Sequence, residues 1–235
     1  MKELETLPAF LARTAGFTLD SLPHDRGLQT SINLPLKVGS DGKMKPFMGN
    51  TVVFPLPEEA KRELGRMQRR LYQTCAPALA EPLETSSLHM TLHDLLSGKP
   101  DQNLCGRIND TRDTALERVR QIMQTGETVR LHSTALFNMV NTSMVLGFAP
   151  ADEESCARLM TYYEILQEAI CLDYPLTPHV TLAYFRPGTV AAEWVEELRG
   201  VVDEVGRRER IVMELPAAAL EYQLFSEMNH YWRDM

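Results

Sequence analysis

Residues 51–74 read TVVFPLPEEAKRELGRMQRRLYQT, and residues 86–95 read SSLHMTLHDL. The first stretch opens with an apolar run that stops at prolines, and apolar residues at helical spacing follow two acids. In the second stretch, apolar residues alternate with His89, Thr91 and His93, which is typical of a strand with one buried face. The segment therefore predicts a strand, a helix and a second strand with a polar face.

The same order returns later in the chain. Residues 143–150, SMVLGFAP, predict a strand, and residues 151–170 predict a helix with acids at its start. Residues 175–185, PLTPHVTLAYF, predict another strand with alternating polar and apolar side chains. This strand carries His179, which follows His89 by 179 − 89 = 90 positions. We interpret the repeat as an internal duplication.

The stretches behind the two histidine strands also match. Residues 111–125 and 190–205 predict helices, and residues 128–138 and 210–222 predict strands. Each half of the chain is then a β-α-β-α-β unit. Such alternation is typical of α/β or α+β layers, and the nearly equal halves predict two lobes that face one cleft.

The repeat divides the chain into three parts. We expect a bilobal domain over residues 51–225, with lobes over roughly 51–140 and 141–225. Residues 1–50 form an N-terminal extension packed on this domain, and residues 226–235 form a C-terminal tail.

Within the extension, residues 31–47 predict a hairpin around Asp41 and Gly42. Lys37, Lys43 and Lys45 lie close to this turn in sequence. We interpret them as a solvated basic turn, and a phosphate-steering element is the less favoured alternative.

Composition excludes several classes of protein. Of the 235 residues, 44% are hydrophobic and 24% are charged, which is typical of a chain with a large core and excludes intrinsic disorder. The net charge of −8 argues against a basic face for long nucleic acid but leaves small anionic ligands possible. No glycine-rich phosphate loop of the Walker or dinucleotide type occurs.

The cysteines and the hydropathy indicate the compartment. The four cysteines form no C-x-x-C pair, which is typical of reduced cytosolic thiols. The N-terminal residues never sustain an apolar run of signal-peptide length, and no stretch has the roughly 20 apolar residues of a membrane span. We expect a cytoplasmic monomer without membrane contact.

Two His-x-Thr elements carry the chemistry. Residues i and i+2 of a strand project from the same face, so His89 stands beside Thr91, and His179 beside Thr181. Of two opposed imidazoles, one can act as general base and the other, protonated, as general acid. The threonine hydroxyls can bind the nonbridging oxygens of a phosphodiester. This set needs no metal, and we expect neither a metal nor a cofactor.

These motifs resemble a known family. LHMTL and PHVTL, about 90 residues apart at the ends of duplicated β-α-β units, are similar to the motifs of the 2H phosphoesterase superfamily. That superfamily includes RNA 2′,3′-cyclic phosphodiesterases and RNA-ligase-like proteins, and the long segment before Val52 suggests a less characterised branch. The resemblance implies an α+β fold: bilobal, pseudo-symmetric β-α-β-α-β units with antiparallel sheets around a central groove and helices outside.

The resemblance also implies an activity. It implies metal-independent hydrolysis of cyclic or linear 2′- or 3′-phosphodiesters, with His89, Thr91, His179 and Thr181 as the site. We expect a 2′,3′-cyclic phosphate end or another small nucleotide phosphodiester as substrate. The alternatives are a nucleotide-binding module of the same fold without turnover, and an unrelated interaction protein whose motifs are coincidental.

The residues behind the second motif depart from the family pattern. Many nucleic-acid-directed members have a basic residue there, whereas Ala183, Tyr184 and Phe185 follow in this chain and Arg186 comes later. Three aromatic side chains could stack on a base: those of Tyr184, Phe185 and Tyr222. We include Tyr184 among the substrate-binding candidates. A place in the core is the favoured alternative for these aromatic side chains.

The other histidines are weaker candidates. His132 lies in a third His-x-Thr, but its surroundings do not repeat, and we expect a structural or surface role. His93 has metal-pair spacing from His89 but lacks the glutamate of the metalloprotease motif, and we expect it at the groove edge on the same strand face as His89. We assign no role to His24 or His230.

Overall fold

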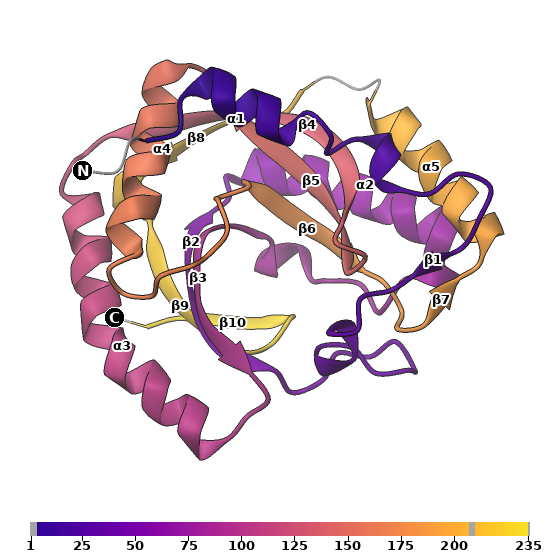
Figure 1. The fold of residues 1–235 in the computed structure, drawn as a ribbon, viewed down its shortest axis with the longest axis horizontal. Coiled ribbons are helices and arrows are strands. Elements are labelled where there is room, and N and C mark those ends of the chain that lie inside the picture. Colours follow the sequence, from indigo (N-terminus) through magenta and orange to yellow (C-terminus); the bar gives the residue numbers. More distant parts are fainter. Residues whose placement is uncertain (1–3, 207–209, 235) are drawn as a thin grey trace.

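The computed structural model describes residues 4–206 and 210–234, so the ends of the extension and of the tail, residues 1–3 and 235, lie outside it. Two four-stranded antiparallel sheets form its centre (Figure 1). The first has the order β10-β9-β2-β3, with strands β2 (Met48–Pro55), β3 (His89–Gly98), β9 (Glu221–Glu227) and β10 (His230–Arg233). The second has the order β6-β5-β4-β8, with β4 (Thr128–Met139), β5 (Ser143–Pro150), β6 (His179–Tyr184) and β8 (Val212–Pro216). The expected α+β class with antiparallel sheets is confirmed.

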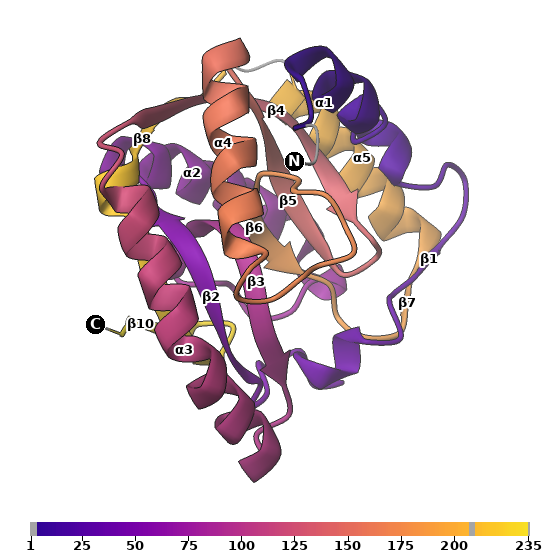
Figure 2. The same ribbon diagram turned by 60° about the vertical axis from the view of Figure 1, so that its left-hand side comes forward.

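The helices lie outside the sheets and pack in pairs. Helix α2 (Glu58–Cys75) packs on α5 (Ala192–Gly206), and α3 (Gln102–Met123) lies beside α4 (Glu153–Leu166), as Figures 1 and 2 show. Each turns one apolar stripe inward, as the helical spacing predicts. Helix α3 begins earlier than predicted because the side chain of Asp101 caps it and accepts a hydrogen bond from the Leu104 amide at 2.7 Å.

The two halves of the chain exchange strands between the sheets. Strand β4, from the first half, pairs with β5, whereas β9, from the second half, pairs with β2. The single strand predicted over residues 210–222 is wrong, because a short 3-10 turn over Ala217–Ala219 divides it into β8 and β9. Pro216 ends β8 at this point, since its ring nitrogen cannot donate to the ladder. The two pieces then enter different sheets.

The exchange leaves the two motif strands at sheet edges. Strands β3 and β6 are the last strands of their sheets, and they contact each other. The hydrophobic core is continuous across both sheets, so the two sheets are packed together. The two His-x-Thr elements therefore lie on neighbouring edges.

The N-terminal extension packs along the second lobe before it enters β2. It contains α1 (Leu7–Thr14) and a short strand, β1 (Leu28–Gln29), which pairs with β7 (Thr189–Val190) beside α5 (Figure 1). The predicted hairpin follows, with a Val38–Met44 bridge and Gly42 in the left-handed region at φ +84°. Among the described residues, no helix combines the length and the apolar composition that a bilayer crossing requires.

Candidate active site

One large cavity contains the predicted site. Its volume is about 660 Å³, and residues of both sheets line it. His89, Thr91, His179 and Thr181 all lie in its wall, and all four are half-buried. The structure thus brings together four residues from two motifs that begin 90 positions apart in the chain, at His89 and His179.

The two imidazoles are held in the same way. Nδ1 of His89 lies 2.8 Å from the carbonyl oxygen of Ser87, and Nδ1 of His179 lies 2.7 Å from that of Thr177. A carbonyl oxygen only accepts hydrogen bonds, so Nδ1 must carry the proton in both rings. This leaves Nε2 of each ring as the atom that can take or release a proton during a reaction.

A β-bulge follows each threonine. In the pairing of β2 with β3, Val53 lies opposite Thr91 while the preceding Val52 lies opposite His93, which leaves Leu92 as the extra residue. Strands β5 and β6 show the same shift, because Val145 and Met144 lie opposite Thr181 and Ala183 and leave Leu182 as the extra residue. Both motif strands therefore change the side that faces the cavity directly after the threonine.

The first bulge overturns one prediction. His93 does not share the cavity face with His89, because the extra residue reverses the alternation of the strand. Its side chain is only 1% exposed, and its ring packs against that of Tyr163 at a centroid distance of 4.9 Å. Asp94 takes the cavity-facing place instead.

Asp94 is held by a residue that the motif does not include. Tyr174, in the loop before β6, donates its hydroxyl to Oδ2 of Asp94 at 2.9 Å. Arg13 of α1 fixes the same loop, because its guanidinium donates to the Leu176 carbonyl at 2.8 Å and to the Thr177 hydroxyl at 3.2 Å. The extension thereby supports the segment whose carbonyl holds His179.

The C-terminal tail also reaches the site. The ring of Tyr231, in β10, packs against the ring of His89 at a centroid distance of 4.7 Å. Tyr231 and Met228 both line the cavity. The rotation of the His89 ring is therefore restricted both by its Nδ1 hydrogen bond and by an aromatic neighbour.

Charges around the histidines are unequal. Burial lowers the pKa of His89 and of His179, and the Asp94 carboxylate opposes this by raising both pKa values. The positive charge of Lys37 further lowers the pKa of His179. For His89, the further lowering of the pKa comes from the neighbouring His179. The free protein therefore favours neutral imidazoles at neutral pH.

Of the three aromatic candidates, Tyr184 alone lines the cavity. The second bulge turns it there, at the position that corresponds to Asp94 in the first lobe. Its hydroxyl lies 3.2 Å from the sulfur of Met228. The favoured place in the core is confirmed for all three, because Tyr184 is only 8% exposed and Phe185 and Tyr222 are fully buried. The hydroxyl of Tyr222 accepts a hydrogen bond from Asn50.

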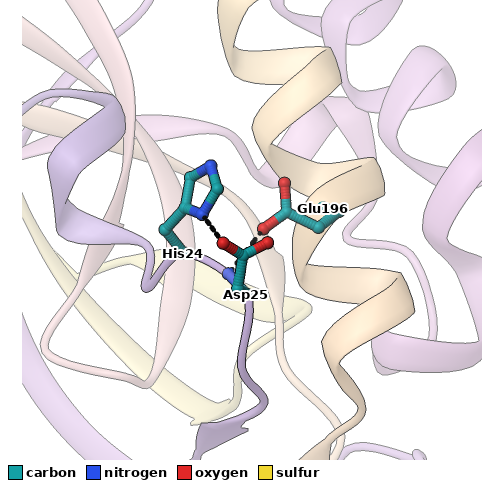
Figure 3. A group of neighbouring side chains, drawn as sticks. All are labelled: His24, Asp25 and Glu196. Carbon is teal, nitrogen blue, oxygen red and sulfur yellow. Dashed lines mark hydrogen bonds and ion pairs between the residues drawn. The ribbon is translucent and has the colours of Figure 1, made fainter.

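The remaining histidines lie elsewhere. His132 is half-buried on β4 outside the cavity wall, and His230 is exposed on β10 with its Nδ1 3.0 Å from the Ser226 hydroxyl. His24, Asp25 and Glu196 form an exposed group outside the cavity, with potential metal-ligand atoms within 4.8 Å of one another (Figure 3). Their contacts with one another account for the group, since Asp25 interacts with His24 and its amide donates to Glu196.

Comparisons with known proteins bear on the fold. No family model matches the chain, and no curated protein matches it in sequence. Among solved structures, a conserved protein of unknown function from Agrobacterium tumefaciens, ATU0111, matches with a TM-score of 0.64 and 21% identity, over 88% of this chain and 93% of that chain. The structural neighbours also include a protein described as a phosphoesterase, with 14% identity and a TM-score of 0.40 over 81% of this chain and 96% of that chain.

Two further structural neighbours are LigT and TT0787. Escherichia coli LigT in complex with 3′-AMP has 15% identity and a TM-score of 0.47, over 81% of this chain and 97% of that chain. TT0787 of Thermus thermophilus has 18% identity and a TM-score of 0.44, over 79% and 94%. ATU0111, with its TM-score of 0.64, shows a fold shared over most of both chains. Identities this low compare folds alone, so the function is argued from the geometry of the site.

Sequence reasoning missed several residues of the cavity wall. Asp94 is adjacent to the first motif, but no local pattern shows the bulge that turns it inward. Tyr174 and Tyr231 lie in segments without clear periodicity. Lys37 belongs to the predicted basic turn, and the structure places its side chain in the cavity wall.

Proposed function

We propose that the protein is a metal-independent phosphodiesterase that hydrolyses 2′,3′-cyclic phosphate ends or another small nucleotide phosphodiester. One observation carries the proposal: two histidines, each with Nδ1 bound to the carbonyl two residues before it, share one cavity with two threonines. This set matches the base, acid and oxyanion ligands that in-line phosphoryl transfer requires.

The proposed reaction uses the free Nε2 atoms. One histidine accepts a proton from water as the water oxygen forms a bond to phosphorus. The other donates a proton to the ribose oxygen as its bond to phosphorus breaks, so the product is a phosphomonoester and a free hydroxyl. Thr91 and Thr181 donate hydrogen bonds to the nonbridging oxygens, which gain negative charge in the transition state. The near symmetry of the motifs means that substrate orientation decides which ester bond breaks.

The cavity supports a substrate of nucleotide size. Its volume of about 660 Å³ lies within the roughly 300–1,000 Å³ of typical small-molecule sites. Tyr184 lines the wall two residues beyond Leu182, where it can contact bound substrate. The net charge of −8 argues against a long nucleic acid as ligand.

One observation favours a second candidate, a nucleotide-binding module without turnover. Burial lowers the pKa of both histidines, so neither holds the proton that a leaving group requires in the free protein. Catalysis then depends on the bound phosphate, whose negative charge raises the pKa of a neighbouring imidazole. Nucleotide binding without product would identify the binding module.

Turnover of a panel of 2′,3′-cyclic nucleotides and short RNAs with cyclic phosphate ends, in excess EDTA, tests the proposal. We expect activity in the wild type and its loss in His89→Ala and His179→Ala. His132→Ala is the matched control, because it removes a half-buried histidine outside the cavity. Activity that disappears with the chelator, or that survives in either site variant, would contradict two-histidine catalysis.

A further inference from the structure

The N-terminal extension holds Lys37 firmly at the cavity. The Lys37 amide donates to the Leu34 carbonyl at 2.9 Å, and the Lys37 carbonyl accepts from the Lys45 amide at 2.8 Å. The first bond closes a 3-10 turn over Leu34–Leu36, and the second closes the base of the hairpin. The backbone at Lys37 is therefore fixed on both sides, and the side chain lies in the cavity wall.

Aromatic rings surround its charge without neutralising it. Nζ of Lys37 lies 5.1 Å from the ring centroid of Phe47 and 5.8 Å from that of Tyr184, and both rings line the cavity. In residues 4–206 and 210–234, no carboxylate lies within ion-pair distance of this ammonium. Cation–π contacts of this kind contribute only about 0.5–1 kcal/mol at accessible sites.

Arg13, the other lysine or arginine in the described cavity wall, differs in this respect. Its guanidinium makes two hydrogen bonds of 2.8 Å to the carboxylate of Glu5 and also holds the Leu176 carbonyl. The charge of Arg13 is thus neutralised by Glu5, and its guanidinium donors are used in contacts within the protein. Lys37 is the cation that remains available to a ligand.

The position of Lys37 is asymmetric. Nζ of Lys37 lies 5.8 Å from the ring centroid of Tyr184, which is on the same strand as His179, so the ammonium lies on the side of the second motif. Its charge also lowers the pKa of His179. The carboxylate of Asp94 acts on both histidines. An anion between the histidines would therefore meet a positive charge on the His179 side.

We propose that Lys37 is an anion-binding residue that contacts the substrate phosphate from the side of His179. The extension thereby supplies the basic group that is missing directly behind the second motif, where Ala183 and Tyr184 follow. The inference rests on the proposed function for the identity of the anion. A charge-assisted hydrogen bond to phosphate is stronger than a cation–π contact, so the ammonium can leave the rings for the ligand.

Substitution of Lys37 by glutamine tests the inference, with Lys43→Gln as matched control. Lys43 lies on the same hairpin but is exposed and outside the cavity wall. The measurements are affinity for inorganic phosphate by calorimetry, steady-state kinetics on cyclic nucleotides, and Tm to establish folding. We expect Lys37→Gln to weaken phosphate binding and to lower kcat/KM roughly 10- to 100-fold, mostly through KM. Lys43→Gln should match the wild type, and Lys37→Arg should restore most of the affinity.

The outcomes separate this inference from the proposed function. Turnover and phosphate binding that Lys37→Gln leaves within twofold of the wild type, at unchanged Tm, would overturn the role of Lys37 alone. Lys37-dependent phosphate binding without turnover of any substrate would support Lys37 and overturn the hydrolase. A wild-type protein that neither binds phosphate nor turns over substrate would overturn both.

Discussion

The two motif strands are alike up to the threonine and different beyond it. In β3 and in β6, Nδ1 of the histidine binds the carbonyl two residues before it, a threonine shares the cavity, and a leucine forms the bulge. After the bulge, the first strand turns Asp94 into the cavity and the second turns Tyr184 into it. The shared histidines and threonines can carry the chemistry. Asp94 and Tyr184 differ in charge and size, so they distinguish the two sides of the cavity.

The surroundings of the two strands follow the same division. Around the first motif strand, the ring of Tyr231 packs against that of His89, and the hydroxyl of Tyr174 donates to Asp94. Around the second, the ammonium of Lys37 lies near the ring of Tyr184. A negative group on one side and a positive group on the other distinguish two histidines whose anchoring is the same.

The largest effect should come from substitution of the two histidines, which both motif strands carry. We expect His89→Ala and His179→Ala each to lower kcat by roughly 10²- to 10⁴-fold, because each removes one proton-transfer group. Steady-state kinetics on the best cyclic substrate measures this. One variant with wild-type kcat would show that the lobes are not chemically equivalent.

The threonines should give the next largest effect. Thr91→Val and Thr181→Val keep the shape but remove the hydroxyl donor, so we expect each to lower kcat by about 10²-fold. Thr91→Ser and Thr181→Ser, which keep the donor, are the matched controls. If valine behaved like serine at either position, that hydroxyl would not bind the reacting phosphate.

Asp94→Asn should sharpen the comparison through pH. Two-histidine catalysis predicts a bell-shaped dependence of kcat/KM on pH, with the base controlling the acidic limb and the acid the alkaline limb. The Asp94 carboxylate raises the pKa of both histidines, so its removal lowers both and should move both limbs to lower pH. A pH profile of wild type and variant measures this, and limbs that stay in place would exclude Asp94 as their electrostatic control.

Lys37→Gln should move one limb of the pH profile of kcat/KM to higher pH, opposite to the effect of Asp94→Asn. Lys37 lowers the pKa of His179, so its removal should raise that pKa. The limb that moves to higher pH then belongs to His179 and assigns it as base or acid. Movement of neither limb would contradict the place of Lys37 beside His179.

The smallest effect concerns two tyrosine hydroxyls. Tyr174→Phe removes a hydrogen bond to a carboxylate and should lower the free energy of unfolding by about 1 kcal/mol. Tyr184→Phe should cost less, because its hydroxyl donates to the sulfur of Met228, which is a weak acceptor. Urea unfolding measures both, and the reverse order would contradict a tighter polar network in the first lobe.

Much of the fold and the main candidates followed from local patterns. The two motif strands, β3 and β6, and the helices that precede them, α2 and α4, lie close to their predicted positions. Hydrophobic periodicity depends on residues that are neighbours in sequence, so it predicts such elements. The pairing of the motifs was readable because the repeat places them equivalently. The division of residues 210–222 was not predicted, because it depends on pairing with two different sheets: β8 pairs with β4, and β9 pairs with β2.

By itself, the sequence determined the elements, the duplication and the His-x-Thr pairs, because these depend on spacing along the chain. Only the tertiary structure decided that Asp94 replaces His93 at the cavity, because the bulge exists in the register between β2 and β3. It likewise brought Lys37 and Tyr231, from opposite ends of the chain, into one wall. Such neighbours are set by packing between distant segments, which leaves no periodic signal in the sequence.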